Sequence, residues 1–459
     1  MAGIGFELRK IYGKKTLASK VYGSLYATMA TIGPTILFML LLLLINLAMG
    51  WYQVPELDRL TFTSSFTYLF LGAILISSLH NAVLSRYISD KVFENREQEI
   101  ADALAGCLIT GTTCSAVVML VLCVTLYGNG LKDLLLLSVY YLLGIFVTNA
   151  YNLLIFVSAL KEYRKITASY LVGLAVSAPV FLVLLRFTRM PFIQAAYAAV
   201  AISFLLINVF LVLCCMRAFG QPRGKYFGFL RYYKKYPALL VSGGLYMLGF
   251  YLSNMIYWAF SDYVAVVCGL KTIPAYDLAT FMAIVVNLPS MVIFVVSAET
   301  AFYEKYVAYL SALGKGSYAR IEKARLSLQK TTQSQLFFVY EAQLIITIIA
   351  ICVAVVAAPY LMLSDTVVTL FSVLAIGFFC LFSMYYTVIM LYYFQAYKAS
   401  AIAVAAFVAV EILGCVICLP MNIFFYSVPM VIGPVIGWVI AFVYLRKLIR
   451  DLNSAMLCR

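Results

Sequence analysis

The sequence predicts an all-α polytopic membrane protein whose twelve transmembrane helices form two six-helix lobes. Of the 459 residues, 64% are hydrophobic and only 11% are charged, whereas soluble domains carry about 25% charged residues. The apolar residues gather in twelve long stretches. Each stretch is near the length of about 20 residues that a helix needs to cross the roughly 30 Å hydrocarbon core. Little sequence remains for a separate soluble domain.

The basic residues set the orientation of these stretches. The predicted spans are residues 21–49, 61–85, 103–127, 134–159, 169–186, 192–216, 237–259, 278–300, 336–358, 366–394, 401–419 and 424–445. Of the 33 Lys and Arg, 28 fall in alternate gaps and five in the others. Loops rich in Lys and Arg stay in the cytoplasm, so we expect a multi-pass protein of the cytoplasmic (inner) membrane with both termini in the cytoplasm.

The segment before the first span is basic and amphipathic, and it lacks the apolar core of a cleavable signal peptide. Ile4, Leu8, Ile11 and Tyr12 lie on one helical face, with the basic residues elsewhere. This pattern is typical of a helix lying on an anionic leaflet. Docking of a cytoplasmic partner is the alternative.

Residues 217–236 form a long, basic connection with six spans before it and six after it. We therefore expect an N-terminal lobe of residues 1–220, which includes the basic amphipathic segment, and a C-terminal lobe of residues 221–459. A six-plus-six arrangement is common in secondary transporters, where two bundles move about a central path. The division rests on the span count, because no residue-level repeat is evident.

Glycine and proline mark further local features. The connection 301–335 is expected to hold two helical pieces broken at Gly314-Lys315-Gly316, which lacks the spacing of a phosphate-binding loop. Pro34 and Pro289 lie inside predicted spans and should kink them. The last two spans are expected to meet around Pro420.

Two carboxylates lie at membrane depth, where an ionisable side chain costs about 2.5–3.5 kcal/mol on insertion scales. Glu411 lies in the middle of span 401–419, and Glu341 lies near the basic end of span 336–358. Glu411 is either a proton-coupling or sugar-binding group, or a neutral carboxyl bonded to a neighbouring helix. For Glu341, extension of the side chain to the membrane surface is the favoured interpretation.

Neutral polar residues recur at spacings of three and four in several spans, which places each set on one helix face. Such faces either bond helices together or line an aqueous path for sugar hydroxyls. The candidate substrate-path residues are Asn81, Ser138, Asn149, Asn152, Asn254, Tyr257, Asn287, Glu341 and Glu411.

The sequence offers no catalytic constellation. His80 is the single histidine, which excludes sites that need several His ligands. No nucleotide-binding loop is evident, and we expect neither a cofactor nor a metal ion. The net charge of +14 is accounted for by the basic loops on one side, so nucleic acid is not an expected partner. The chain is predicted to be a non-enzymatic transporter.

The opening decapeptide, Met1 to Lys10 (MAGIGFELRK), the length and the twelve-span layout together resemble the PelG family, exporters of the Pel exopolysaccharide. The resemblance implies a MOP superfamily fold, close to MATE transporters, with two lobes around a central cavity. It also implies export of a nascent, N-acetylgalactosamine-rich polymer for a biofilm matrix. The implied partners are a cytoplasmic glycosyltransferase (PelF-like) and a cyclic-di-GMP-sensing membrane protein (PelD-like). No family transport residues can be carried over one by one.

Two other interpretations remain open. The same layout suits a MATE-like cation-coupled exporter or a lipid-linked oligosaccharide flippase, and a dominant role of Glu411 in cation binding would favour the cation-coupled exporter. Alternatively, the chain is a non-conducting membrane scaffold of a polysaccharide synthase, in which the polar faces only bond helices together.

Overall fold

The computed structural model describes residues 28, 32–160, 163–188 and 190–457. Within these residues, twelve helices are long and apolar enough to cross a membrane, and each predicted span overlaps one of them. Residues 21–27 and 29–31 of the first predicted span lie outside the described residues. The prediction of twelve transmembrane helices is thus confirmed. The amphipathic segment with Ile4, Leu8, Ile11 and Tyr12 lies outside the described residues.

The chain divides into two compact units. The N-unit comprises Gly33–Met247 and Val264–Thr272, and the described part of the C-unit comprises Leu248–Tyr263 and residues 273–457. The division falls inside α10 (Pro237–Phe260), whereas the predicted lobes divide within the connection 217–236. The other helices of the N-unit are α3 (Gly33–Trp51), α4 (Glu56–Phe93), α5 (Glu97–Gly128), α6 (Leu134–Ala159), α7 (Tyr163–Phe187), α8 (Phe192–Phe219) and α9 (Leu230–Lys235).

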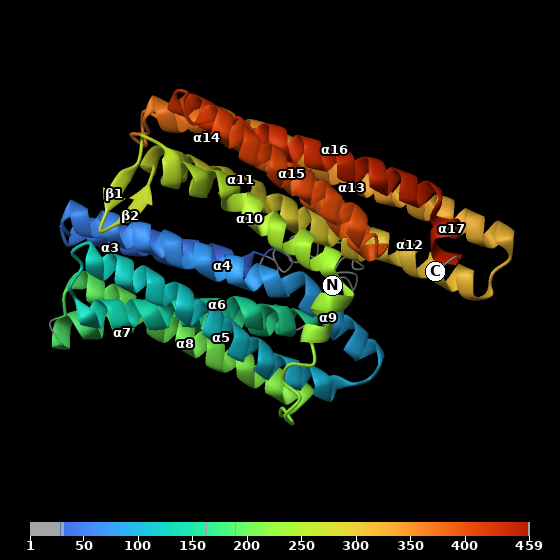
Figure 1. Ribbon diagram of the computed structural model, residues 1–459, viewed down its shortest axis with the longest axis horizontal. Helices are drawn as coiled ribbons and strands as arrows, with labels where there is room; N and C mark the ends of the chain where they lie inside the picture. The colour runs from blue at the N-terminus through green and yellow to red at the C-terminus, as the bar shows by residue number, and fades with distance from the viewer. Residues whose placement is uncertain (1–27, 29–31, 161–162, 189, 458–459) are drawn as a thin grey trace, which may run out of the picture. The chain divides into compact units, whose positions relative to one another are not determined.

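Helix α6 is the centre of the N-unit, because it packs against α4, α5 and α8, while α7 packs on α8 (Figure 1). Its start is defined by Asp133, whose carboxylate accepts the backbone N–H of Leu136 at 3.1 Å. A side-chain cap of this kind satisfies a donor that the helix leaves unpaired. Rings of Tyr140 from α6 and Tyr197 from α8 meet edge to face at 5.8 Å in the core.

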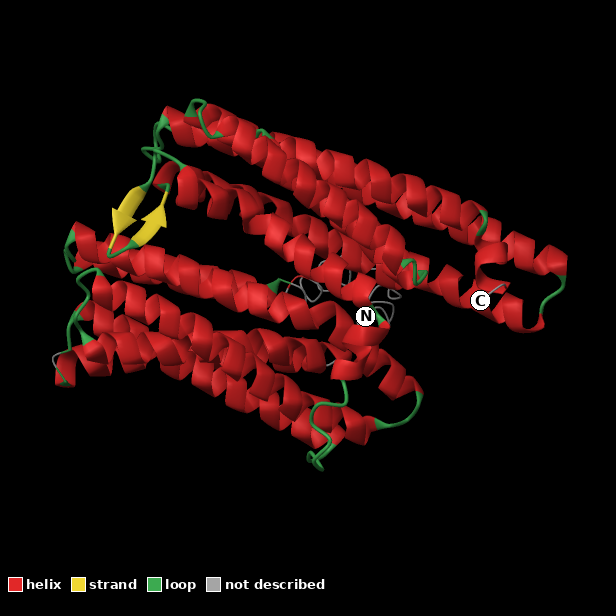
Figure 2. Cartoon of the chain, in the orientation of Figure 1, coloured by secondary structure: helices red, strands yellow, loops and turns green. Residues whose placement is uncertain are grey.

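A two-stranded hairpin follows α10 in the sequence and belongs to the N-unit. Strands β1 (Ala265–Val267) and β2 (Leu270–Thr272) pair antiparallel through Val267 and Leu270 (Figure 2). Its two turn residues, Cys268 and Gly269, have φ of 48° and 79°, the backbone that tight hairpin turns require. Both strands contact α4. The sequence pattern predicts no strand here, because the segment is only a short gap between two spans.

The elements that remain form the C-unit. They are α11 (Pro274–Ser297), the π-helical turn η1 (Ala298–Phe302), α12 (Tyr303–Lys315), α13 (Tyr318–Ala357), α14 (Asp365–Tyr393), α15 (Tyr397–Cys418), the 3₁₀ turn η2 (Ile423–Ser427), α16 (Pro429–Arg450) and α17 (Leu452–Leu457). Helix α14 is central and packs on α11, α13 and α16, and α15 packs on α16. The last two spans are therefore separate helices, as predicted.

Glycines allow close helix contacts in the C-unit. A Cβ at Gly377 of α14 would lie 2.6 Å from the backbone oxygen of Met430 on α16. Gly433 and Gly437 on α16 face Phe407 of α15 in the same way, with gaps of 3.1 and 2.8 Å to the nearest Phe407 atom. Small residues four apart are the usual device for close packing of membrane helices.

The predicted break at Gly314–Gly316 is confirmed, since α12 ends at Lys315 and α13 begins at Tyr318. Pro289 lies inside α11 as predicted. Pro34 is the second residue of α3, which begins at Gly33. In the first turn a proline removes no intrahelical hydrogen bond.

The basic connection 217–236 is tied to α5. The buried carboxylate of Asp102 accepts the backbone N–H groups of Arg223 (2.5 Å) and Gly224 (3.2 Å). Gln98 donates to the backbone oxygen of Gln221 at 2.5 Å. This connection is therefore an ordered part of the N-unit, and α9 within it contacts α4.

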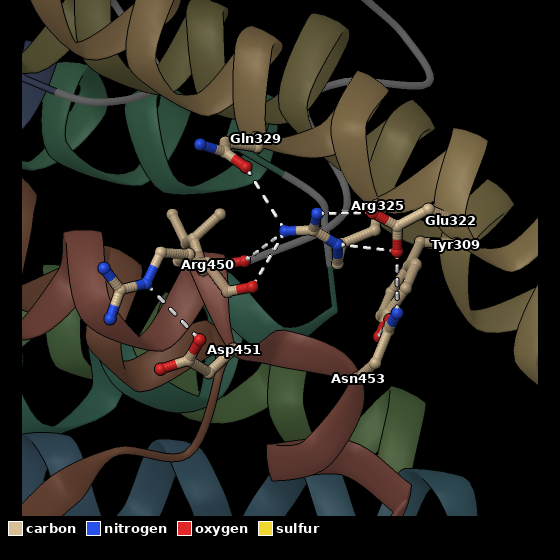
Figure 3. A network of polar contacts seen from close by, with 8 residues as sticks. Tyr309, Glu322, Arg325, Gln329, Arg450, Asp451 and Asn453 are labelled. Atoms are coloured by element: carbon tan, nitrogen blue, oxygen red, sulfur yellow. Dashed lines mark hydrogen bonds and ion pairs between the residues drawn. The ribbon is translucent and has the colours of Figure 1, made fainter.

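An arginine network joins α12, α13, α16 and α17 at the end of the C-unit where the basic loops lie (Figure 3). Arg325 pairs with Glu322 and donates to the carbonyl oxygens of Ile449 (3.3 Å) and Arg450 (2.8 Å). Asn453 donates to Glu322 at 3.0 Å and accepts from the Tyr309 hydroxyl at 2.9 Å. Burial raises the pKa of Tyr309, so its hydroxyl stays protonated and continues to donate.

Replacing Arg325 by Ala is expected to lower the stability of the C-unit by about 1–3 kcal/mol, because carbonyls at the end of α16 lose a charged donor. Thermal unfolding of the purified protein, followed by tryptophan fluorescence, measures this change. Lys323→Ala is the matched control, since Lys323 lies two residues away on α13 and forms no ion pair within the described part of the chain. Equal melting temperatures for the two variants would contradict the structural role of the network.

Candidate functional site

A buried polar cluster lies in the C-unit, where α10, α11 and α15 approach one another. It consists of Asn254, Tyr257, Tyr276, Thr280 and Glu411, and we call it the C-unit cluster. Each of these side chains is at most 4% exposed. Each has a polar atom without a hydrogen-bond partner in the described protein, and Glu411 has two. Buried polar atoms are rarely left in this way, so the cluster is a candidate site for a polar ligand or a proton.

Aromatic contacts hold the cluster in place. The ring of Tyr257 stacks on Tyr426 at 4.0 Å and meets Tyr276 edge to face at 5.4 Å. Ser253 lies beside both the Tyr276 hydroxyl and the Glu411 carboxyl, and Cys415 lies beside the Tyr257 hydroxyl. The hydroxyls and the carboxyl thus converge from three helices.

Glu411 is fully buried on α15. Helix α16 packs closely against Glu411 at Gly433, where a Cβ added to the glycine would lie 3.2 Å from Glu411 Cβ. No basic side chain forms an ion pair with it in the part of the chain that the structure describes. An unpaired carboxylate anion at such a place is strongly disfavoured, so a proton or a cation has to accompany it.

Asp277 lies next to this cluster but has a different role. Its carboxylate accepts from Asn254 Nδ2 (2.8 Å), Trp258 Nε1 (3.0 and 3.1 Å) and the backbone N–H of Ile273 (3.0 Å). These bonds fix the start of α11 against α10. With its oxygens satisfied, Asp277 is a structural group that positions Asn254.

A second cluster lies in the N-unit between α5 and α6. Asn149 donates to the Thr112 hydroxyl at 2.8 Å, while its own amide oxygen has no partner. Asn152 is fully buried, and neither of its amide atoms has a partner in the described protein. A Cβ at Gly111 would lie 2.3 Å from Asn152 Nδ2 and 3.2 Å from Asn149 Oδ1. Both amides therefore face α5 across a glycine.

The other predicted site residues lie elsewhere. Asn81, Ser138 and Glu341 are exposed on α4, α6 and α13. Ser138 donates to the Leu134 carbonyl at 2.7 Å within its own helix, and Asn81 accepts from Ser85 at 3.4 Å. None of the three belongs to either buried cluster.

Asn287 is fully buried, and both ends of its amide are bonded. It donates to the carbonyl oxygens of Ala283 (2.9 Å) and Ala375 (3.2 Å) and accepts from Gln343 Nε2 (3.0 Å). These bonds join α11 to α14 and α13. In this structure Asn287 bonds helices together.

Tyr276 and Thr112 complete the two clusters but are not predicted from the sequence, whereas Thr280 belongs to the polar face of its span together with Asn287. Tyr276 and Thr280 are four residues apart on α11, so they share a helix face. That spacing was available as a signal, but the helix that they face is remote in the sequence.

The two clusters supply amides, hydroxyls and one carboxyl. Within the described residues, no three His, Cys, Asp or Glu side chains gather closely enough to hold a metal ion. Groups of this kind can hydrogen-bond a neutral polar ligand such as a sugar, and Glu411 can exchange a proton.

Comparison with known sequences gives a family match over nearly the whole chain. The model of the PelG family, described as "Putative exopolysaccharide Exporter (EPS-E)", matches residues 1–456. A search of curated protein sequences found no significant match.

Comparison with solved structures gives the fold. An outward-facing MATE multidrug transporter of the MOP superfamily is similar with a TM-score of 0.64 and 13% identity, over 93% of this chain and 96% of the other. A MATE transporter in a bent conformation has a TM-score of 0.64 and 12% identity, over 94% and 96%. A MOP superfamily transporter from Pyrococcus furiosus has a TM-score of 0.61 and 15% identity, over 93% and 96%. The chain has the fold of these transporters.

Proposed function

We propose, from the premise that this chain belongs to the PelG family, that it exports a nascent Pel-type, N-acetylgalactosamine-rich exopolysaccharide for a biofilm matrix. The family match over residues 1–456 is the observation that carries the proposal. Family and fold together indicate a multi-pass membrane transporter. The identity of the transported polymer is the part that we propose.

The chemistry of the two clusters supports a sugar as the transported group. The hydroxyls and amides of a sugar hydrogen-bond to water in solution and can hydrogen-bond instead to the side-chain amides of Asn149, Asn152 and Asn254. Because these side chains are uncharged, the exchange of partners costs little electrostatic free energy. Tyr257 adds a ring and a hydroxyl to the C-unit cluster. The N-unit cluster carries no charged side chain, and the C-unit cluster carries only Glu411.

The orientation and the partners belong to the same proposal. The clustering of Lys and Arg in alternate loops favours a cytoplasmic membrane location with both termini in the cytoplasm. A PelF-like glycosyltransferase would deliver the polymer on that side, and a PelD-like cyclic-di-GMP sensor would regulate the complex. The connection 217–236, held to α5 by Asp102, is a suitable docking surface for such a partner.

Asn152→Leu and Asn287→Leu make a matched pair that tests the proposal. Leucine at position 152 breaks no hydrogen bond within the described protein, so the protein level should be unchanged while secretion falls at least about tenfold. Leucine at position 287 removes three bonds, each worth roughly 0.6–2 kcal/mol in a membrane, so the protein level should fall. The measurement is secreted polymer per unit of membrane-inserted protein.

Secretion per protein that is unchanged in Asn152→Leu would remove the N-unit cluster from the path. If both variants reduce secretion only in step with the protein level or with the recovery of partner proteins, the non-conducting scaffold becomes the better explanation. If secretion is normal in cells that lack the chain, the export proposal fails.

A further inference from the structure

The N-unit contains a cavity of about 460 Å³ at the end of its helices opposite the basic loops. It lies between the last turns of α3, α5 and α7 and the first turns of α4, α6 and α8. Its volume falls in the range of roughly 300–1,000 Å³ that is typical of small-molecule sites. None of the candidate path residues lines it.

Aromatic rings line both the buried and the open part of this cavity. Tyr140 and Tyr197 are buried, and both bond to Ser65. The Ser65 hydroxyl shares a hydrogen bond with the Tyr197 hydroxyl, and the Ser65 backbone carbonyl accepts from the Tyr140 hydroxyl at 2.8 Å. At the open part, Tyr52 and Phe192 lie with ring centroids 5.4 Å apart, and Tyr52 is 58% exposed. Exposed rings that are held by a neighbour offer a flat apolar face to a ligand.

The polar lining is acidic. Among the described residues that line the cavity, Asp58 and Asp133 are the two charged ones, and none is Lys or Arg. Asp133 is held in place because it caps α6 through Leu136 N and also accepts from Gln194 Nε2. An acidic lining attracts an amino group, tolerates a neutral group and repels a carboxylate.

The turn that forms the rim is braced. Arg59 donates to the carbonyl oxygens of Val54 (2.8 Å) and Met49 (3.0 Å), which joins the end of α3 to α4. Gln53 in this turn has φ of 49°, a conformation that non-glycine residues adopt at some cost. Arg59, one of the few basic residues at this end of the unit, therefore stabilises the turn at the rim of the cavity.

We infer that this cavity is a saccharide subsite that binds a neutral or amino-bearing sugar unit and rejects an acidic one. Three features of the lining fit this ligand class. The flat rings can stack on the apolar face of a sugar, the planar Gln and Asp side chains can hydrogen-bond its hydroxyls, and the net negative charge of the described lining residues favours an amino group over a carboxylate. The carboxylates do not suit a lipid acyl chain, which has no polar group to bind them. A phospholipid head group would place its negative phosphate next to the two carboxylates, which would repel it. The inference rests on the proposed export of a saccharide, for which this cavity would receive the polymer on the side away from the basic loops.

Binding of defined trisaccharides to the full-length protein in lipid nanodiscs tests the subsite. The probes are galactosamine, N-acetylgalactosamine and galacturonic acid trisaccharides, measured by isothermal titration calorimetry. Nanodiscs avoid detergents with sugar head groups, which would compete. We expect the first two probes to bind and the acidic one to show no binding.

Variants then locate the binding. Tyr52→Ala should weaken both binding probes at least about fivefold through the lost ring contact. Asp58→Asn combined with Asp133→Asn should weaken galactosamine more than N-acetylgalactosamine, because asparagine still caps α6 but carries no charge. Tyr360→Ala and Glu56→Gln are the controls: Tyr360 is 85% exposed in the C-unit, and Glu56 lies beside the cavity without lining it. They should bind as the wild type does.

Three results would overturn the subsite: no trisaccharide binding by the wild type, binding that Tyr52→Ala leaves unchanged, or equal binding of the acidic probe. A phospholipid retained by the wild type and lost from Tyr52→Ala in native mass spectrometry would assign the cavity to lipid. Secretion in cells that lack the chain is measured separately. Loss of secretion without saccharide binding refutes only the subsite, whereas binding with normal secretion refutes only the export function.

Discussion

Replacing Glu411 by Gln is expected to reduce polymer secretion at least about tenfold while the amount of folded protein stays the same. Glutamine keeps the size and the neutral hydrogen-bonding capacity of a protonated carboxyl, but it has no proton to exchange. Both carboxyl oxygens lack a hydrogen-bond partner in the described protein, and the side chain is fully buried. Glutamine offers Ser253 the same neutral neighbour as the protonated carboxyl, so the fold should be kept while a function that needs the carboxyl proton is lost.

The measurement is secreted polymer per membrane-inserted protein, with and without a protonophore. If Glu411 takes up and releases protons during export, wild-type secretion falls when the proton gradient collapses. The small remaining secretion by Glu411→Gln should not respond. Glu341→Gln is the matched comparison, since Glu341 is exposed on α13 and its replacement should leave secretion near the wild-type value.

Two outcomes would contradict a role of Glu411 in transport. Wild-type secretion by Glu411→Gln would show that a neutral amide suffices, so that the residue binds neighbours or sugar without proton exchange. A loss of secretion that merely follows a loss of protein would make the carboxyl a packing group. A response to a sodium gradient in place of the proton gradient would move the chain toward the cation-coupled alternative.

The number and positions of the spans could be predicted because they depend on local sequence. Each span is a continuous apolar run, and its length and apolar character mark it as long enough to cross the membrane. The break between α12 and α13 was likewise visible in Gly314-Lys315-Gly316. The whole-chain family match and the transporter fold agree with the resemblance of the opening decapeptide.

The roles of individual polar residues could not be predicted, because their partners are remote in the sequence. Asn152 and Asn287 are the same residue type in similar apolar spans. Asn287 meets Ala375 and Gln343, whereas both amide atoms of Asn152 remain without a partner. The cavity of the N-unit was also missed, because six helix ends form it and no single span shows it.

Gly377→Ala is expected to impair the folding of the C-unit. An ideal Cβ at this position lies 2.6 Å from the backbone oxygen of Met430 and 3.0 Å from its carbonyl carbon. A backbone carbonyl cannot rotate away as a side chain can, so α14 and α16 would have to separate. Overpacking of this kind costs about 1–3 kcal/mol and occasionally more. The intrinsic helix preference has the opposite sign and favours Ala by roughly 0.8–1 kcal/mol.

The level of folded protein and the thermal stability of the purified chain measure this effect, with Gly50→Ala as the control. Gly50 of α3 has no atom within 4 Å of an ideal Cβ, so alanine there should be neutral or slightly stabilising. Because α16 also packs on α15 through Gly433, displacement of α16 should disturb the surroundings of Glu411. The folded fraction of Gly377→Ala should therefore secrete less polymer per molecule. Wild-type stability of Gly377→Ala would mean that α14 and α16 are not in close contact, and the packing that places Glu411 in the C-unit cluster would lose its support.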